Sequence, residues 1–147
     1  MKMKVTISTI ENNDIFRIIN CGDKVGNDTN MSLYNCIAMN FRIDPLILKK
    51  CAYTHLEVLY LSCDSGIERL IPEGNMYENV KHLISYRNQD KSGDSAILYA
   101  IADIYKCRVM LIKYKKKCNQ IDIFEPTKQY TSQVSLFLRD NYYYLII

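Results

Sequence analysis

The spacing of apolar residues changes along this 147-residue chain, and that change constrains the fold more than any other feature. Up to about residue 105, most apolar side chains recur every three or four positions, which is typical of helices that pack by one face. From residue 107 onward the apolar runs are short and polar turns separate them, which is typical of strands. This order predicts an α+β fold with helices packed on a small, largely antiparallel sheet.

The expected elements follow from this spacing and from the turn residues. Strands are predicted at Val5–Ile10, Cys107–Ile112, Gln120–Phe124, Val134–Leu138 and Tyr143–Ile147, the last four as a meander, and helices at Leu33–Phe41, Asp44–Cys63, Met76–Tyr86 and Ser95–Tyr105. Ile15–Ile19 is either a second strand or a short helix. Asn20–Asn30 and Arg87–Asp94 are rich in turn formers and are predicted loops, and Arg139–Asn141 suits a hairpin bend. With no internal repeat or linker, residues 1–147 are interpreted as one domain.

Composition excludes several classes of protein. A net charge of +3 is too small to indicate binding to nucleic acid or to a membrane surface. The apolar runs are too short to cross a bilayer, and the start of the chain lacks the pattern of a signal peptide, so a cytoplasmic location is expected.

The 6 cysteines are scattered without a C-x-x-C pair and are expected to be reduced. With only 2 histidines, we expect no metal and no cofactor. The Lys-, Asn- and Ile-rich usage is compatible with an AT-rich coding sequence, as in an insect virus, a mobile element or an intracellular bacterium.

The junction between the loop and the first long helix, Asp28–Ile37, is the most informative stretch for chemistry. A nucleophile in the first turn of a helix gains from the positive end of the helix dipole and from unpaired backbone N–H groups. Ser32 has that position. The competing interpretation is that Ser32 only caps the helix, as serine often does.

Four segments of the chain resemble motifs of the ovarian-tumour (OTU) family of cysteine deubiquitinases. These segments are Ser32–Ile37 (Ser-Leu-Tyr-Asn-Cys-Ile), Ser92–Ala102, Ile123–Pro126 and Val134–Ile146. In the family they correspond to the helix that begins with the catalytic cysteine, a second helix, a strand that ends in Glu-Pro, and the strands that deliver the catalytic histidine. The resemblance runs in order from about Ile15 to the C-terminus and implies a cysteine-protease-like α+β fold.

The departures from the family pattern fall on the catalytic positions. Ser32 stands where the cysteine is expected, Tyr142 (or Asn141, shifted by one) where the histidine is expected, and Tyr144 where the residue that orients the histidine is expected. Thr29, or Asp28 with one inserted residue, matches the leading aspartate of the motif. A serine hydroxyl needs a base to take its proton, and neither tyrosine nor asparagine can act as that base near neutral pH. The resemblance therefore implies an OTU-like fold with a degenerate catalytic site.

These departures favour a catalytically inactive protein that binds ubiquitin, a ubiquitin-like modifier or another protein. The expected binding cleft lies between the loop that precedes the helix, the Ser92–Gly93 turn and the final bend, and its residues are Asn30, Met31, Ser32, Ser92, Gly93, Asn141 and Tyr142. Two alternatives stay open: an active deubiquitinase with Ser32 or Cys36 as nucleophile, and an interaction module unrelated to ubiquitin.

Four further features have two interpretations each. Cys36 is either a nucleophile or a buried packing thiol, and His55 and His82 are either bases or ordinary helix residues. Lys113–Lys117 either contacts phosphates or forms a solvated turn. Tyr142–Tyr144 either forms a recognition surface or packs on a strand, where alternation directs Tyr143 away from its two neighbours.

Overall fold

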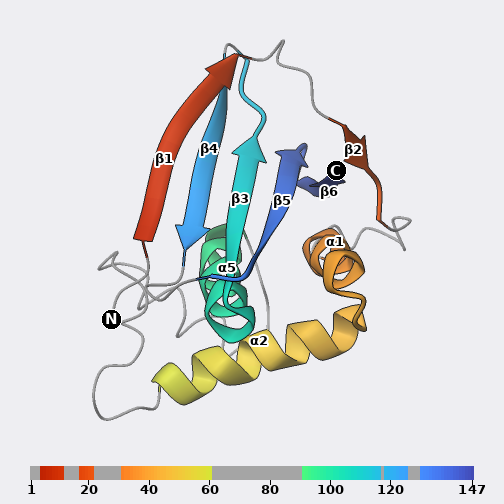
Figure 1. The fold of residues 1–147 in the computed structure, drawn as a ribbon, viewed down its shortest axis with the longest axis vertical. Coiled ribbons are helices and arrows are strands. Elements are labelled where there is room, and N and C mark those ends of the chain that lie inside the picture. The colour runs from red at the N-terminus through yellow and green to blue at the C-terminus, as the bar shows by residue number, and fades with distance from the viewer. Residues whose placement is uncertain (1–3, 12–16, 22–30, 61–90, 117, 126–129) are drawn as a thin grey trace.

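The computed structural model describes residues 4–11, 17–21, 31–60, 91–116, 118–125 and 130–147. Within these ranges the chain has a mixed α+β fold, in which helices pack on a six-stranded sheet with the strand order β1-β4-β3-β5-β6-β2 (Figure 1). The strands are β1 (Lys4–Glu11), β2 (Ile18–Ile19), β3 (Cys107–Lys113), β4 (Cys118–Glu125), β5 (Ser132–Arg139) and β6 (Tyr142–Ile146), and the helices are α1 (Met31–Phe41), α2 (Pro45–Tyr60) and α5 (Lys91–Tyr105). The predicted helix at 76–86 and most of the predicted loop at 20–30 lie outside the described residues.

The sheet is largely antiparallel, as predicted, but the predicted meander of the last four strands is wrong. β5 pairs with β3, and the two strands run parallel, with Val109 opposite Val134. The reason is non-local: β1 occupies the far edge of β4 along its whole length, from Lys4 opposite Glu125 to Glu11 opposite Cys118. β5 therefore pairs with the remaining edge of β3, and β6 and then β2 extend the sheet beyond it.

The two-residue bend between β5 and β6 has the geometry of a tight hairpin turn. Arg139 pairs with Tyr142, and between them Asp140 and Asn141 have φ angles of 53° and 64°. Two successive residues in the left-handed region are typical of a type I′ turn, whose twist matches that of the strands, and Asp and Asn tolerate this region better than most residues. The predicted hairpin is therefore confirmed.

Helix α2 begins where the sequence predicted. The Asp44 side chain accepts hydrogen bonds from the backbone N–H groups of Leu46 at 2.8 Å and Ile47 at 3.3 Å. Pro45 fits the first position because a proline there costs no hydrogen bond. Asp44 is thus the N-cap of α2.

Helix α5 begins at Lys91, so the predicted turn at Ser92–Gly93 is wrong: both residues lie in the first helical turn. A glycine in a helix costs only about 1 kcal/mol relative to alanine. Burial outweighs that cost, because every residue from Ala96 to Ala102 is fully buried. The ring of Tyr99 meets that of Phe124 edge to face, with centroids 5.1 Å apart.

The core lies between the three described helices and one face of the sheet. Helix α5 packs against β3 and β4, α1 packs against β6, and α2 contacts both helices (Figure 1). The buried sheet residues on this face include Val109, Leu111, Phe124, Val134, Leu136, Tyr143 and Leu145. None of the described helices combines the length and the apolar character that a bilayer crossing requires.

Candidate functional site

The start of helix α1 lies directly against the start of strand β6. The hydroxyl oxygen of Ser32 accepts a hydrogen bond from the Tyr143 backbone N–H at 3.0 Å. One helical turn later, the Cys36 thiol donates to the Tyr143 carbonyl oxygen at 3.4 Å. Both main-chain polar groups of Tyr143 are therefore held by side chains of α1, and the segments that contain Ser32 and Tyr142 lie side by side.

Ser32 is buried, with 3% of its surface exposed. Its hydroxyl oxygen faces a peptide N–H, which donates a proton in the hydrogen bond and cannot take one from the serine. This contact orients α1 on the sheet, so Ser32 has a packing role in the first turn of the helix. Met31, the other described cleft residue at this end of α1, is partly buried and packs against the core. Asp28, Thr29 and Asn30 lie outside the described residues.

The tyrosines of β6 alternate between the two faces of the sheet, as predicted. Tyr143 belongs to the core cluster beneath the helices. The rings of Tyr142 and Tyr144 contact each other, with centroids 5.0 Å apart. The Tyr142 hydroxyl donates to the Asn20 side-chain oxygen at 2.7 Å, beside β2, so it is directed away from Ser32. Asn141 is exposed in the hairpin turn.

Cys36 is 1% exposed, which agrees with its interpretation as a packing thiol. Burial raises its pKa well above the ordinary value of 9.0, because a thiolate loses its hydration in the core. The proximity of Cys21 raises the pKa further. Cys36 is therefore a protonated hydrogen-bond donor at neutral pH.

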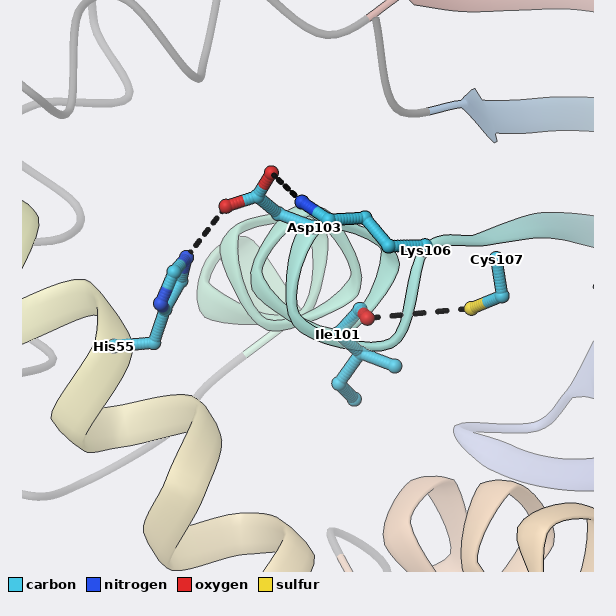
Figure 2. A network of polar contacts seen from close by, with 5 residues as sticks. All are labelled: His55, Ile101, Asp103, Lys106 and Cys107. Carbon is cyan, nitrogen blue, oxygen red and sulfur yellow. Dashed lines mark hydrogen bonds and ion pairs between the residues drawn. The ribbon is translucent and has the colours of Figure 1, made fainter. Parts of the chain in front are cut away.

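His55 joins helix α2 to helix α5 instead of facing Ser32. Its Nε2 atom lies 2.8 Å from Asp103 Oδ2, and Lys106 Nζ lies 3.5 Å from Asp103 Oδ1 (Figure 2). The hydrogen bond with His55 lowers the pKa of Asp103 below its ordinary value, against an opposing effect of burial and with further help from Lys106. In the same view the buried Cys107 thiol points to the Ile101 carbonyl oxygen, and burial raises its pKa to about 11. His82, the other candidate base, lies outside the described residues.

A cavity of about 490 Å³ opens between α5, the end of β3 and the β5–β6 hairpin. Its described lining residues are Ser95, Leu98, Leu111, Lys113, Tyr114, Lys115, Leu138, Arg139, Asp140, Asn141 and Tyr143. Asn141 of the predicted cleft is among these lining residues, whereas Ser92 and Gly93 lie in the first turn of α5 and are not. Ser32 and Tyr142 are not among the lining residues, although Ser32 is bonded to Tyr143 on its wall.

Basic and aromatic side chains shape the outer part of this cavity. The Arg139 guanidinium lies 4.9 Å from the centre of the Tyr114 ring, and this cation–π contact holds the guanidinium over that ring. Lys113 pairs with Asp122 at 2.8 Å, and Gln120 donates to the same carboxylate at 2.9 Å. Lys113 is thus compensated inside the fold.

The predicted cleft did not include Tyr114, Arg139 and Tyr143, although the segments that contain Tyr114 and Tyr143 were weighed as contact surfaces. Tyr114 and Arg139 meet because β3 and β5 run in parallel, which brings the Tyr114 N–H to the Leu138 carbonyl at 2.9 Å. The predicted meander separated these two segments. Tyr143 could have been found from strand alternation, since it shares the buried face with Leu145.

Within the part of the chain that the structure describes, no group of three or more His, Cys, Asp or Glu side chains is placed to hold a metal ion. Compared with known proteins, the sequence matches no family model and no curated protein.

Proposed function

We propose that this protein is a catalytically inactive, OTU-like binding module that holds ubiquitin or a ubiquitin-like modifier at the cavity beside the start of α1. The observation that carries the proposal is the buried hydrogen bond from the Tyr143 N–H to Ser32 Oγ. It supports the view that the segments resembling a nucleophile helix and a base-bearing strand have kept their contact while their side chains serve packing.

The contacts of the substituted positions oppose catalysis. Acyl transfer by a hydroxyl or thiol needs a base within hydrogen-bonding reach of the nucleophile. The Tyr142 hydroxyl is bonded to Asn20, and a tyrosine at that position has too high an ordinary pKa to act as a base at neutral pH. An active enzyme that used Cys36 would need to ionise a buried thiol whose pKa is raised.

The exposed residues at the rim of the cavity support binding of a partner protein. Tyr114 is 44% exposed, and the Arg139 side chain that covers it is 55% exposed. Tyrosine and arginine are enriched among the residues that contribute most to protein–protein affinity, since each offers a large contact area and a directed polar group. The cavity behind them can receive a narrow segment of a partner chain.

Two measurements test this function. A ubiquitin probe with an electrophile at its C-terminus is expected to leave the wild-type protein unlabelled, because the Ser32 hydroxyl faces a peptide N–H and burial keeps the Cys36 thiol protonated. Isothermal titration with free ubiquitin is expected to show binding. Tyr114→Ala and Arg139→Ala are each expected to weaken that binding by about tenfold, equivalent to about 1.4 kcal/mol.

Matched control variants separate a specific surface from general damage. Tyr130→Ala and Lys50→Ala also remove exposed side chains, but from positions outside the cavity lining, and are expected to bind as the wild type does. Labelling by the probe would establish an active enzyme in place of a binding module. An absence of both labelling and binding would favour an interaction module unrelated to ubiquitin.

A further inference from the structure

Two cysteine side chains meet beside the start of β6. Ile19 of β2 pairs with Leu145 of β6, and the antiparallel direction of this pair brings Cys21, two residues later, to the level of Tyr143. Cys21 is partly buried and packs against the core. The Cys36 thiol reaches the same residue from α1, where it donates to the Tyr143 carbonyl oxygen. Both cysteines thus lie beside the same residue of β6.

The Cys21 thiol donates to the Ile19 carbonyl oxygen at 3.9 Å, and the proximity of Cys21 raises the pKa of the Cys36 thiol. Both cysteines are free thiols in this structure, and they come from segments separated by the chain between β2 and α1. A disulfide needs two sulfur atoms that can approach to bonding distance with little backbone movement, and two neighbouring cysteines beside Tyr143 are close to that arrangement.

We propose that Cys21 and Cys36 are a site of reversible oxidation and form an intramolecular disulfide with a low-molecular-weight disulfide, such as oxidised glutathione, as the oxidant. The inference stands on the placement of both cysteines beside Tyr143 and does not depend on what the cavity binds.

The order of the two steps follows from exposure. Cys21 is partly exposed, whereas Cys36 is 1% exposed, so the Cys21 thiolate attacks the small disulfide first. This step forms a mixed disulfide on Cys21 and releases one thiolate. The Cys36 sulfur then attacks the Cys21 sulfur while its proton passes to the departing sulfur, which forms the protein disulfide and releases the second small thiol. In sum, two protein thiols are oxidised, one small disulfide is reduced to two thiols, and the two protein protons pass to the products.

The cross-link would tie the segment that follows β2 to α1, one helical turn from Ser32. Because Tyr143 lies between this tie and the cavity, its backbone N–H is expected to exchange with solvent more slowly in the oxidised protein. Reduction with dithiothreitol is expected to restore the original exchange rate.

Peptide mapping of the oxidised native protein tests the proposal. Trypsin cuts after Arg17, Lys24 and Arg42, so Cys21 and Cys36 fall in separate peptides, 18–24 and 25–42, each with a single cysteine. The expected result is one cross-linked species that joins these two peptides, in a protein that has lost the mass of two hydrogen atoms. Oxidation in concentrated urea is expected to spread the pairing over several cysteines.

Variants provide the controls. Cys51→Ser removes an exposed thiol and is expected to leave the 18–24 to 25–42 cross-link intact. Cys21→Ser is expected to abolish it, and Cys36→Ala is expected to leave a stable glutathione adduct on Cys21. The proposal is overturned if the oxidised native wild type keeps that adduct unresolved, pairs either cysteine with another, or leaves both thiols reduced. These results come from the wild-type map, so they remain decisive even if the Cys36→Ala core variant fails to fold.

Discussion

Replacement of Ser32 by alanine removes the one acceptor oxygen on α1 that is bonded to the Tyr143 N–H at 3.0 Å. Ser32 and Tyr143 are each 3% exposed, so water cannot readily replace the lost hydroxyl. A buried donor without its partner costs about 1–3 kcal/mol. Alanine is a better helix former than serine by about 0.5 kcal/mol, which offsets part of that loss. We therefore expect Ser32→Ala to lower the free energy of unfolding by about 0.5–2.5 kcal/mol.

Urea denaturation, followed by far-ultraviolet circular dichroism, measures this change. Ser135→Ala is a matched control, because Ser135 also accepts a hydrogen bond, from the Gln133 side chain at 3.0 Å, but at a partly exposed position on β5. Its expected effect is within about 0.5 kcal/mol of zero. Amide hydrogen exchange locates the effect, since in Ser32→Ala the Tyr143 N–H is expected to lose protection more than the amides of β3.

The packing role of Ser32 would be refuted if Ser32→Ala were as stable as Ser135→Ala. It would also be refuted if the Tyr143 amide kept its full protection in Ser32→Ala. Either result would mean that the contact between α1 and β6 does not depend on the hydroxyl group.

Three further predictions concern other polar contacts. Asp44→Ala removes the N-cap of α2 and is expected to cost about 1 kcal/mol in urea denaturation, most of which Asp44→Ser should restore. The hydrogen bond with His55 lowers the pKa of Asp103 below its ordinary 3.8, so the ionised carboxylate stabilises the fold above that pH and the contribution is lost as pH falls through the lowered pKa. Asp103→Asn is therefore expected to flatten the decline of stability in acid-denaturation profiles below about pH 4. Lys113→Met leaves the Asp122 side chain, 8% exposed, without its cation and is expected to cost about 1–3 kcal/mol in urea denaturation.

Each of these predictions has a result that would contradict it. For the cap, equal stability of Asp44→Ala and Asp44→Ser would show that the side-chain oxygen is unimportant. For the α2–α5 contact, the stability of Asp103→Asn could fall in acid as steeply as that of the wild type. That result would show that protonation of the Asp103 carboxylate does not cause the acid destabilisation. For the buried Asp122 carboxylate, Lys116→Met is the control because Lys116 is exposed. If Lys113→Met and Lys116→Met lowered the free energy of unfolding equally, the ion pair between Lys113 and Asp122 would have no stabilising role.

The elements that sequence reasoning predicted well are those whose signals are local. Asp44 and Pro45 mark the start of α2 with a cap and a tolerated proline, and Asp140 and Asn141 suit the left-handed turn between β5 and β6. The alternation of the three tyrosines of β6 is equally local, because it depends only on the two-residue period of a strand.

The features that sequence reasoning missed depend on distant parts of the chain. The partner of β5 is decided by β1, which occupies the far edge of β4 and leaves β3 as the neighbour. The cavity also depends on this strand pairing, because Tyr114 and Arg139 come together only when β3 and β5 run side by side. The start of α5 was misplaced because Ser92 and Gly93 resemble a loop locally, while the burial of the residues that follow extends the helix.

The strand order also determines when the sheet can be completed during synthesis. β1 pairs with residues 118–125 and β2 pairs with residues 145–146, so both outer strands depend on partners made about a hundred residues later. Such long sequence separations slow folding, because a large loop must close before any pairing energy is gained. During synthesis β1 therefore remains without its partner until residues 118–125 have been made, and β2 until residues 145–146 have been made. A chaperone that shields β1 and β2 would act in that interval.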